Sequence, residues 1–534
     1  MANLFFRSML VLALLFGLLF AVGMVILTAI DAPVWMAVIF GLGILFLQYL
    51  LGPWILQLIY KIEWRDPQSI DPNLAEFIGR VCAERRIPVP HFGVIHDGNP
   101  TAFTFGHYPG DARLVVTTGL LELLDQKEHQ AVVAHELGHI VHWDFVVMTV
   151  AAAIPLILYI LSRVALSGRG RGKGGGYLAL VGILSYVAYL VSQFIALLLS
   201  RVREYYADQF ASEVTGNPNA LSSALVKVAY GLAAAPKDSK KKDDVRMTAA
   251  RAFGIFDPRA AQSLALAGAG SGPVSVESME NAMKWDLWNP WAKLFELSST
   301  HPLPAKRIRA LERQSEANGQ LPQFSFRAEQ PESYWDEFLV DAFINYLPPI
   351  ALLAALAWAA ISAYTLRFSI GGVGLALLLV SLAWWLKRRF SYRRGFDDRR
   401  AVSSLIGEVK VSAVRSIPCT LEGHIIGRGV PGLFYSEDLV LQDNTGYIVV
   451  DYRQPLGILE FLFGWLKAGE LIGRRGKVMG WYRRSPRPYV ELRKMILEDG
   501  KTITSYSYPV AQFLVYAGIL LGAILLIAQF VLLR

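Results

Sequence analysis

Long apolar stretches alternate with polar blocks along this chain. A helix needs about 20 mostly apolar residues to cross the hydrocarbon core of a bilayer. The pattern predicts seven membrane-spanning helices, at residues 10–30, 34–55, 146–166, 177–199, 349–366, 370–386 and 510–533. The first stretch is too long for the apolar core of a signal peptide, so we expect it to stay in the protein as an anchor.

Three polar blocks lie between these spans, at residues 63–144, 201–341 and 387–509. The third block alternates β-rich runs with turn residues, a pattern typical of strands. We expect strands at 420–426, 438–441, 447–452, 477–482 and 489–495, with one helix at 457–468. Five short strands and one helix predict a small OB-like barrel.

Composition supports a membrane protein. Hydrophobic residues make up 54% of the 534 residues and charged residues only 18%, against about 25% charged in a typical soluble domain. Mean hydropathy is +0.37. Two cysteines exclude a disulfide scaffold, and the high hydrophobicity excludes disorder as a description of the whole chain.

The net charge of +8 comes largely from basic residues beside apolar stretches, such as Lys387, Arg388 and Arg389 after the sixth span. Positive charge gathers on the cytoplasmic side of spans, so we place all three polar blocks in the cytoplasm. The basic loop 168–174 then falls outside; either it is an exception or its two helices do not fully cross. Nucleic-acid binding by the barrel is the less favoured interpretation; it would use Tyr482, Arg483, Arg484, Arg487 and Tyr489. We expect Trp285, Trp288 and Trp291 at the lipid headgroup boundary, with substrate binding as the alternative.

The sharpest chemical signal is His135-Glu136-Leu137-Gly138-His139. The segment has helical spacing, with Asp125 as the expected N-cap. Positions i and i+4 share one helix face, so both imidazoles can hold one zinc ion. Glu136 would then lie beside a bound water as its general base. A chance match of solvated histidines is the alternative, and a structural zinc site would favour cysteine-rich shells.

A third ligand is needed, and Glu204 can supply it. The metzincin pattern would require Gly at 142 and His at 145, but the chain has His142 and Phe145. Glu204 follows the fourth span and His139 precedes the third, so the hairpin returns the chain to one place. Asp208, one turn later, could accept the outer N–H of a ligating histidine. Read alone, Glu204 and Asp208 could be an exposed charged face.

These motifs resemble the HtpX-like membrane zinc metallopeptidases, relatives of the CAAX prenyl endopeptidases. The matching stretches are 114–124, 135–144, 200–208 and 299–308. The resemblance implies that His301 supports the oxyanion and that Arg307 braces the site. It also implies that Thr101, Ala102, Phe103 and Thr104 form a substrate-binding strand, although Thr101 replaces the asparagine usual in the family.

The sequence therefore predicts a mainly α polytopic membrane protein with a gluzincin-type zinc protease domain and a small all-β C-terminal domain. The expected division is two spans in 1–62, the protease in 63–335 with its hairpin 146–199, two spans in 336–386, the OB-like domain in 387–509 and a last span in 510–534. We expect one Zn²⁺ per chain and cleavage of membrane or misfolded proteins at the cytoplasmic face of the inner membrane. The alternatives are processing of lipidated substrates and a non-catalytic scaffold whose barrel binds a protein partner.

Overall fold

The computed structural model describes residues 34–167, 175–231, 276–324, 330–367, 369–433, 435–485 and 487–532. Six of their helices are long and apolar enough to cross a membrane. They are α2 (Val34–Ile59), α6 (Asp144–Ser167), α7 (Gly175–Thr215), α14 (Trp335–Tyr364), α15 (Ile370–Ser391) and α18 (Ser507–Leu532). These match six of the seven predicted spans. The span at 10–30 and the basic loop 168–174 lie outside the described residues.

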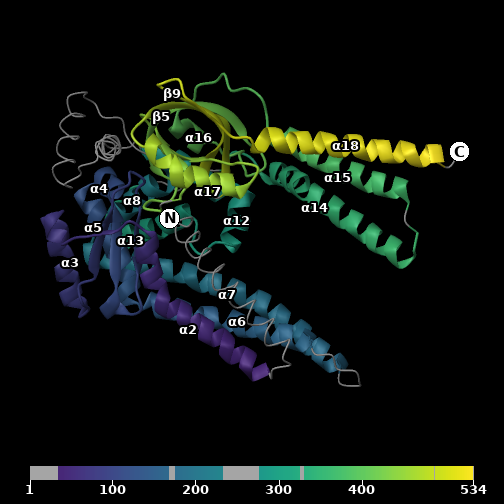
Figure 1. The fold of residues 1–534 in the computed structure, drawn as a ribbon. Coiled ribbons are helices and arrows are strands. Elements are labelled where there is room, and N and C mark those ends of the chain that lie inside the picture. Colours follow the sequence, from purple (N-terminus) through teal and green to yellow (C-terminus); the bar gives the residue numbers. More distant parts are fainter. Residues whose placement is uncertain are drawn as a thin grey trace.

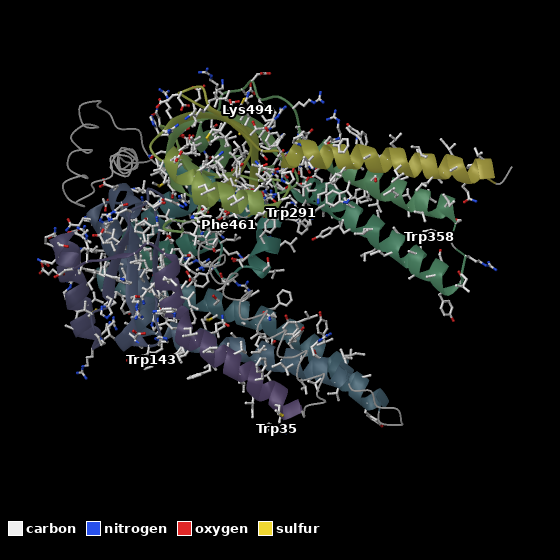
Figure 2. The ribbon with its side chains drawn as sticks, in the orientation of Figure 1. Trp35, Trp143, Trp291, Trp358, Phe461 and Lys494 are labelled. Carbon is white, nitrogen blue, oxygen red and sulfur yellow. The ribbon has the colours of Figure 1, made fainter. Side chains whose placement is uncertain are left out.

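The six helices form two groups, α2 with α6 and α7, and α14 with α15 and α18 (Figure 1). Both groups extend away from the folded body, and they splay apart (Figure 1). In the second group, a Cβ at Gly374 would lie 2.8 Å from the carbonyl oxygen of Gly522. Glycine at this crossing lets α15 and α18 approach closely, as small residues do in membrane helix pairs. Large apolar side chains such as Trp35 cover the outer surfaces, as lipid contact requires (Figure 2).

A small mixed sheet and its covering helices form the body nearest the first group. The strands are β1 (Glu63–Trp64), β2 (His91–Ile95), β3 (Ala102–Phe105) and β4 (Arg113–Thr117), in the order β1-β2-β4-β3. β2 and β4 are parallel, and β3 pairs antiparallel with β4 at the edge of the sheet. The associated helices are α3 (Pro72–Arg85), α4 (Thr118–Leu123), α5 (Gln126–Val141), α8 (Pro218–Tyr230), α11 (Val276–Trp288), α12 (Pro290–Leu297) and α13 (Pro304–Ala317).

The C-terminal block is a closed five-stranded barrel, which confirms the predicted OB-like domain. Its strands are β5 (Ile417–Arg428), β6 (Leu439–Gln442), β7 (Tyr447–Asp451), β8 (Arg475–Ser485) and β9 (Arg487–Leu497). They run in the order β9-β7-β6-β5-β8, and β8–β9 pairing closes the ring. β7 is parallel to β9, and α17 (Gly457–Leu466) and η3 (Ala468–Leu471) connect β7 to β8. The short α16 (Val402–Ile406) precedes the barrel, and β10 (Thr502–Thr504) extends its sheet.

The barrel packs on the body that holds the mixed sheet, through side chains for which the sequence pattern indicated contacts with nucleic acid or lipid. Arg484 is fully buried, and its guanidinium donates to Asp286 Oδ1 (3.1 Å) and to the carbonyl oxygens of Ala282 and Ile406. Trp285 is also fully buried and donates to the carbonyl oxygen of Val411. The headgroup position expected for Trp285 and Trp291 is therefore wrong, because both indoles are buried in the contacts between elements.

Candidate metal centre

Two helices supply the three predicted metal ligands. α5 begins at the expected N-cap, Asp125, which forms a reciprocal capping box with Glu128. His135 and His139 lie one turn apart on α5, with ring centroids 4.8 Å apart. α7 is a single helix of 41 residues, about 60 Å long at 1.5 Å per residue, so it extends past a bilayer and carries Glu204 to the paired imidazoles.

The distances fit one tetrahedral zinc ion. His135 Nε2 lies 3.6 Å from Glu204 Oε2, and His139 Nε2 lies 3.7 Å from Glu204 Oε1. Two ligands at about 2.0–2.1 Å from a tetrahedral zinc are about 3.4 Å apart. One ligand atom from each of the three residues lies within 4.8 Å of the others, which makes a His-His-Glu metal group. The Glu204 carboxylate is therefore close enough to both imidazoles for all three residues to bind the same ion.

Each histidine is oriented by a carboxylate behind it. His135 Nδ1 lies 3.0 Å from Asp208 Oδ1, and His139 Nδ1 lies 2.6 Å from Asp144 Oδ2. These contacts hold the Nδ1 protons and leave both Nε2 atoms for a metal, the usual arrangement of zinc-binding histidines. The sequence pattern pointed to Asp208 and missed Asp144.

Asp144 reaches His139 because the chain breaks between α5 and α6. Five positions along an ideal helix correspond to a rotation of about 140°, so in an unbroken helix the Asp144 carboxylate would face away from His139. α5 instead ends at Val141, Trp143 adopts a left-handed φ of 59°, and α6 begins at Asp144. α5 and the span α6 are therefore two separate helices joined by a sharp turn.

Burial favours neutral His139 at the site. Burial lowers the pKa of His139, which suits a ligand that binds metal through an unprotonated nitrogen. For His135, burial and Arg307 lower the pKa, but hydrogen bonds with Asp208 and Glu204 raise it to about 9 overall. A proton and a metal ion therefore compete for His135.

Arg307, on α13, ties the carboxylates of the site together. Its guanidinium lies 2.6 Å from Asp208 Oδ1 and 3.0 Å from Glu204 Oε2. Burial opposes the positive charge, but the Asp208 and Glu204 carboxylates raise the pKa of Arg307 above its usual value. Arg307 therefore remains charged and fixes the position of Glu204 relative to Asp208.

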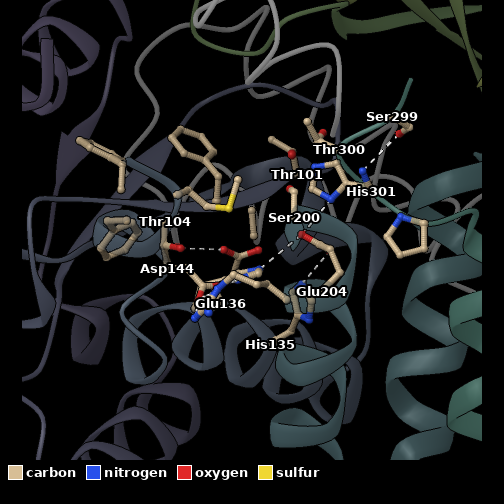
Figure 3. A pocket seen from close by; sticks show the side chains of 18 of the residues that line it. Thr101, Thr104, His135, Glu136, Asp144, Ser200, Glu204, Ser299, Thr300 and His301 are labelled. Carbon is tan, nitrogen blue, oxygen red and sulfur yellow. Dashed lines mark hydrogen bonds and ion pairs between the residues drawn. The ribbon is translucent and has the colours of Figure 1, made fainter. Parts of the chain in front are cut away.

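Glu136 lies between the metal group and the edge strand. Its buried carboxylate accepts a hydrogen bond from Thr104 Oγ1 at 3.1 Å, from β3 (Figure 3). The strand is fixed by β4, with Ala102 opposite Val116 and Phe103 opposite Val115. Thr101 precedes it, and its N–H donates to Thr117 Oγ1.

Asn99, two residues before Thr101, binds the barrel and not the metal group. Its side-chain amide donates to the carbonyl oxygens of Arg428 and Gly429 at the barrel, at 3.0 and 3.1 Å.

His301 closes the group from the loop before α13. Its ring Nδ1 lies 2.8 Å from Glu204 Oε1, and its main-chain N–H donates to Ser299 Oγ (Figure 3). The side chain is one-third exposed, unlike the buried residues around it. The structure thus brings His301 to the metal group, a position that sequence spacing alone could not predict.

A cavity of about 510 Å³ opens onto these residues. The metal ligands, Glu136, His301 and β3 line it on one side. Tyr49 and Leu56 of α2 and Met148 and Ala152 of α6 line it as well, so two membrane-spanning helices form part of the wall. Tyr49 OH also donates to the carbonyl oxygen of His107, which ties α2 to the loop after β3.

Comparison with known proteins agrees with this site. Peptidase family M48 matches residues 68–315. The chain is 38% identical over 228 residues to a protein named protease HtpX homolog from Methanothermobacter thermautotrophicus, covering 42% of this chain and 86% of that protein. It is 30% identical over 318 residues to the protease HtpX homolog of Aeropyrum pernix, covering 57% of this chain and 95% of that protein. A crystal structure of S. mikatae Ste24p is similar at 17% identity and a TM-score of 0.36, over 58% of this chain and 67% of that one.

The M48 match ends at residue 315, before α14, α15, the barrel and α18. Within the match lie all three metal ligands, Glu136 and the spans α6 and α7. This multi-pass membrane protein with a His-His-Glu zinc site belongs to the M48 metallopeptidases, among the HtpX homologues.

Proposed function

We propose that this peptidase cleaves membrane or misfolded proteins at the cytoplasmic face of the membrane, in protein quality control. One observation carries the proposal: a single cavity is lined by the metal group, by an edge strand and by the spans α2 and α6. A peptide segment bound there would touch the catalytic residues and the membrane-spanning helices at once. Substrates embedded in or emerging from the bilayer suit this wall best.

The proposed chemistry assigns each side chain one task. Zinc bound by His135, His139 and Glu204 supplies Lewis acidity toward the scissile carbonyl and the attacking water. Glu136 accepts the proton of that water and delivers it to the leaving amine, with Thr104 Oγ1 holding the carboxylate in place. His301 donates to the developing oxyanion. Arg307 and Asp208 act as positioning residues, because they contact ligands and not the reacting atoms.

Residues 101–104 are proposed to hold the substrate backbone. β3 is an edge strand in the described sheet, with β4 on one side only. An edge strand can pair with an extended peptide through main-chain hydrogen bonds. Because Thr104 also contacts Glu136, a peptide paired with β3 would lie next to the general base.

A cytoplasmic orientation is supported by the charges where α15 leaves the membrane. Lys387, Arg388 and Arg389 stand in the last turns of α15, directly before the barrel. α18 begins at Ser507, and Arg388 donates to the carbonyl oxygen of Tyr508 at 2.6 Å. The two spans therefore leave the barrel on the same side.

Two alternative functions, processing of lipidated substrates and a non-catalytic scaffold, are less well supported than this proposal. Processing of a lipidated substrate would call for a chamber enclosed by spans, whereas the described spans form two splayed groups (Figure 1). A scaffold with an inactive metal site would not need a complete ligand set together with Glu136. The barrel could also bind a protein partner in either case.

Glu136→Gln tests the reaction. Zinc should remain bound to the purified full-length variant, because Glu136 is not one of the three ligands, while cleavage of an unfolded protein such as casein should be lost. Loss of zinc together with activity would show only a damaged site, so metal content is measured in the same samples. Full cleavage by the zinc-loaded variant would refute the assigned base. Proteins that accumulate in membranes expressing Glu136→Gln, relative to wild type, would identify substrates.

A further inference from the structure

The barrel forms part of the catalytic cavity. Arg487 and Pro488, at the start of β9, line the same cavity as the metal ligands. A second cavity of about 610 Å³ lies between the barrel and the protease body. Thr101, Thr300, Arg487 and Pro488 line both cavities, so the two adjoin. A polypeptide longer than the first cavity would therefore pass along the barrel.

Arg487 differs from the neighbouring arginines in having no side-chain partner among the described residues. Arg483 is paired with Glu491 at 2.8 Å and Arg484 with Asp286 at 3.1 Å, and both guanidinium groups are buried. Arg487 is half-buried, and its guanidinium forms no hydrogen bond or ion pair with a described residue, although its main chain pairs with Ser485 in the β8–β9 ladder. Burial lowers the pKa of Arg487 to about 10. The side chain is thus a cation at neutral pH, partly removed from water and facing a cavity.

We infer that Arg487 of the barrel binds a carboxylate of the substrate, supplied by an acidic side chain or by the C-terminus of the chain being cut. The inference rests on the proposed function, since it names a subsite of the proposed peptidase cleft. A guanidinium can form two parallel hydrogen bonds with a carboxylate, so a carboxylate is the ligand that fits the Arg487 side chain best. A glutamine in the substrate has nearly the same size as a glutamate but no charge, so a Gln peptide is the matched control for a Glu peptide.

The charged residues of the second cavity support binding of this carboxylate at Arg487. Glu437, Asp438, Asp451 and Glu460 line the second cavity, and Asp451 is already paired with Arg453. These four carboxylates outnumber Arg453 and Arg487, the two basic residues in the same lining, so the second cavity favours an acidic group less than its junction with the first does. An acidic residue of the substrate is therefore held at the junction of the two cavities.

Internally quenched peptides test the subsite on the zinc-loaded full chain in detergent. One neutral sequence is varied by placing Glu, Gln or Lys at each position in turn, and each peptide is made with a free and an amidated C-terminus. The wild type should prefer Glu over Gln at one position, or the free over the amidated C-terminus, by about ten-fold in kcat/KM. The position data identify a side-chain carboxylate, and the C-terminal pairs identify a terminal one.

Variants decide whether Arg487 is responsible. Arg487→Gln should reduce the preference to about one-fold, and Arg487→Lys should keep part of it, because lysine keeps the charge without the two-pronged geometry. Lys494→Gln, at an exposed position on the same strand, is the matched control and should keep the wild-type ratio. Melting temperatures of all variants show whether each is folded.

Binding separates this inference from the proposed activity. Dye-labelled Glu and Gln peptides are titrated by fluorescence anisotropy into Glu136→Gln and into the double variant that also carries Arg487→Gln. Tighter binding of the acidic peptide only when Arg487 is present supports the subsite even if no peptide is cut. Equal use of Glu and Gln with both kinds of C-terminus, or a preference that survives Arg487→Gln, would overturn it. Peptide cleavage that does not depend on Glu136 would count against the proposed function and not against the subsite.

Discussion

Arg484→Met should separate the barrel from the protease body. The guanidinium of Arg484 is fully buried and pairs with Asp286, whose side chain is 2% exposed. It also lies 4.7 Å from the ring centre of Trp285 and donates to two carbonyl oxygens. Methionine fills most of the volume but leaves Asp286 buried beside only the Tyr230 hydroxyl, at 2.5 Å, and the Ala305 N–H. Removing one partner of a buried ion pair costs about 3–5 kcal/mol.

The loss of stability in Arg484→Met should depend on pH. Burial raises the pKa of Asp286, and Arg484 opposes that shift. Without Arg484 the pKa of Asp286 rises further, so the carboxyl is protonated at low pH and its burial costs less there. The destabilisation should therefore be smaller at about pH 5 than at about pH 8.

Thermal unfolding of the detergent-solubilised full chain measures the effect. For a loss of this size we expect the melting temperature to fall by about 10 °C near pH 8. Asp286→Asn combined with Arg484→Met should recover part of the loss, because it removes the unpaired charge. Lys494→Met, on the exposed face of the same barrel, is the control (Figure 2). A single variant that melts within about 2 °C of wild type would show that this buried pair does not hold the two bodies together.

Further outcomes follow from the metal site and the barrel contact. Removal of metal by a chelator should abolish cleavage, and one equivalent of Zn²⁺ should restore it; activity that persists in metal-free protein would contradict the zinc mechanism. Asp208→Asn should weaken zinc binding by about 10–100-fold, measured against a chromophoric chelator, because His135 loses its carboxylate partner. Asp97, at the barrel contact, has its pKa raised by burial to about 7, so its ionisation destabilises the fold as pH rises from about 4 to about 7. Asp97→Asn should therefore increase the unfolding free energy by at most about 4 kcal/mol, and the melting temperature should rise more at about pH 8 than at about pH 5. An equal rise at both pH values would show that the carboxyl is not buried as a charge.

Local patterns predicted several parts of this protein well. A run of about 20 apolar residues has few alternatives to a spanning helix, and six of the predicted spans were confirmed among the described residues. Helix periodicity places His135 and His139 on one face of α5, and the return of the hairpin brings Glu204 to them, so the sequence predicted the whole group. Alternating strands and the turn at 443–446 likewise predicted the barrel.

Residues at contacts between domains were predicted poorly. Trp285 was expected at the headgroup boundary because a tryptophan near a span is usually found there, and Arg484 was named only as a residue that nucleic-acid binding would use. Whether a polar side chain is buried depends on a partner far away in the sequence, and Arg484 and Asp286 are separated by 198 residues. No local pattern encodes such a partner.

The sequence alone determined the spans, the barrel and the chemistry of the metal ligands, since these depend on the spacing of residues within one or two elements. Only the tertiary structure decided that Asp144 orients His139, that His301 meets Glu204, and that Arg487 of the barrel faces the catalytic cavity. The physical reason is the same in each case. Helix breaks, loop paths and the packing of one domain on another set these contacts, and the free energy that fixes them comes from burial summed over the whole fold.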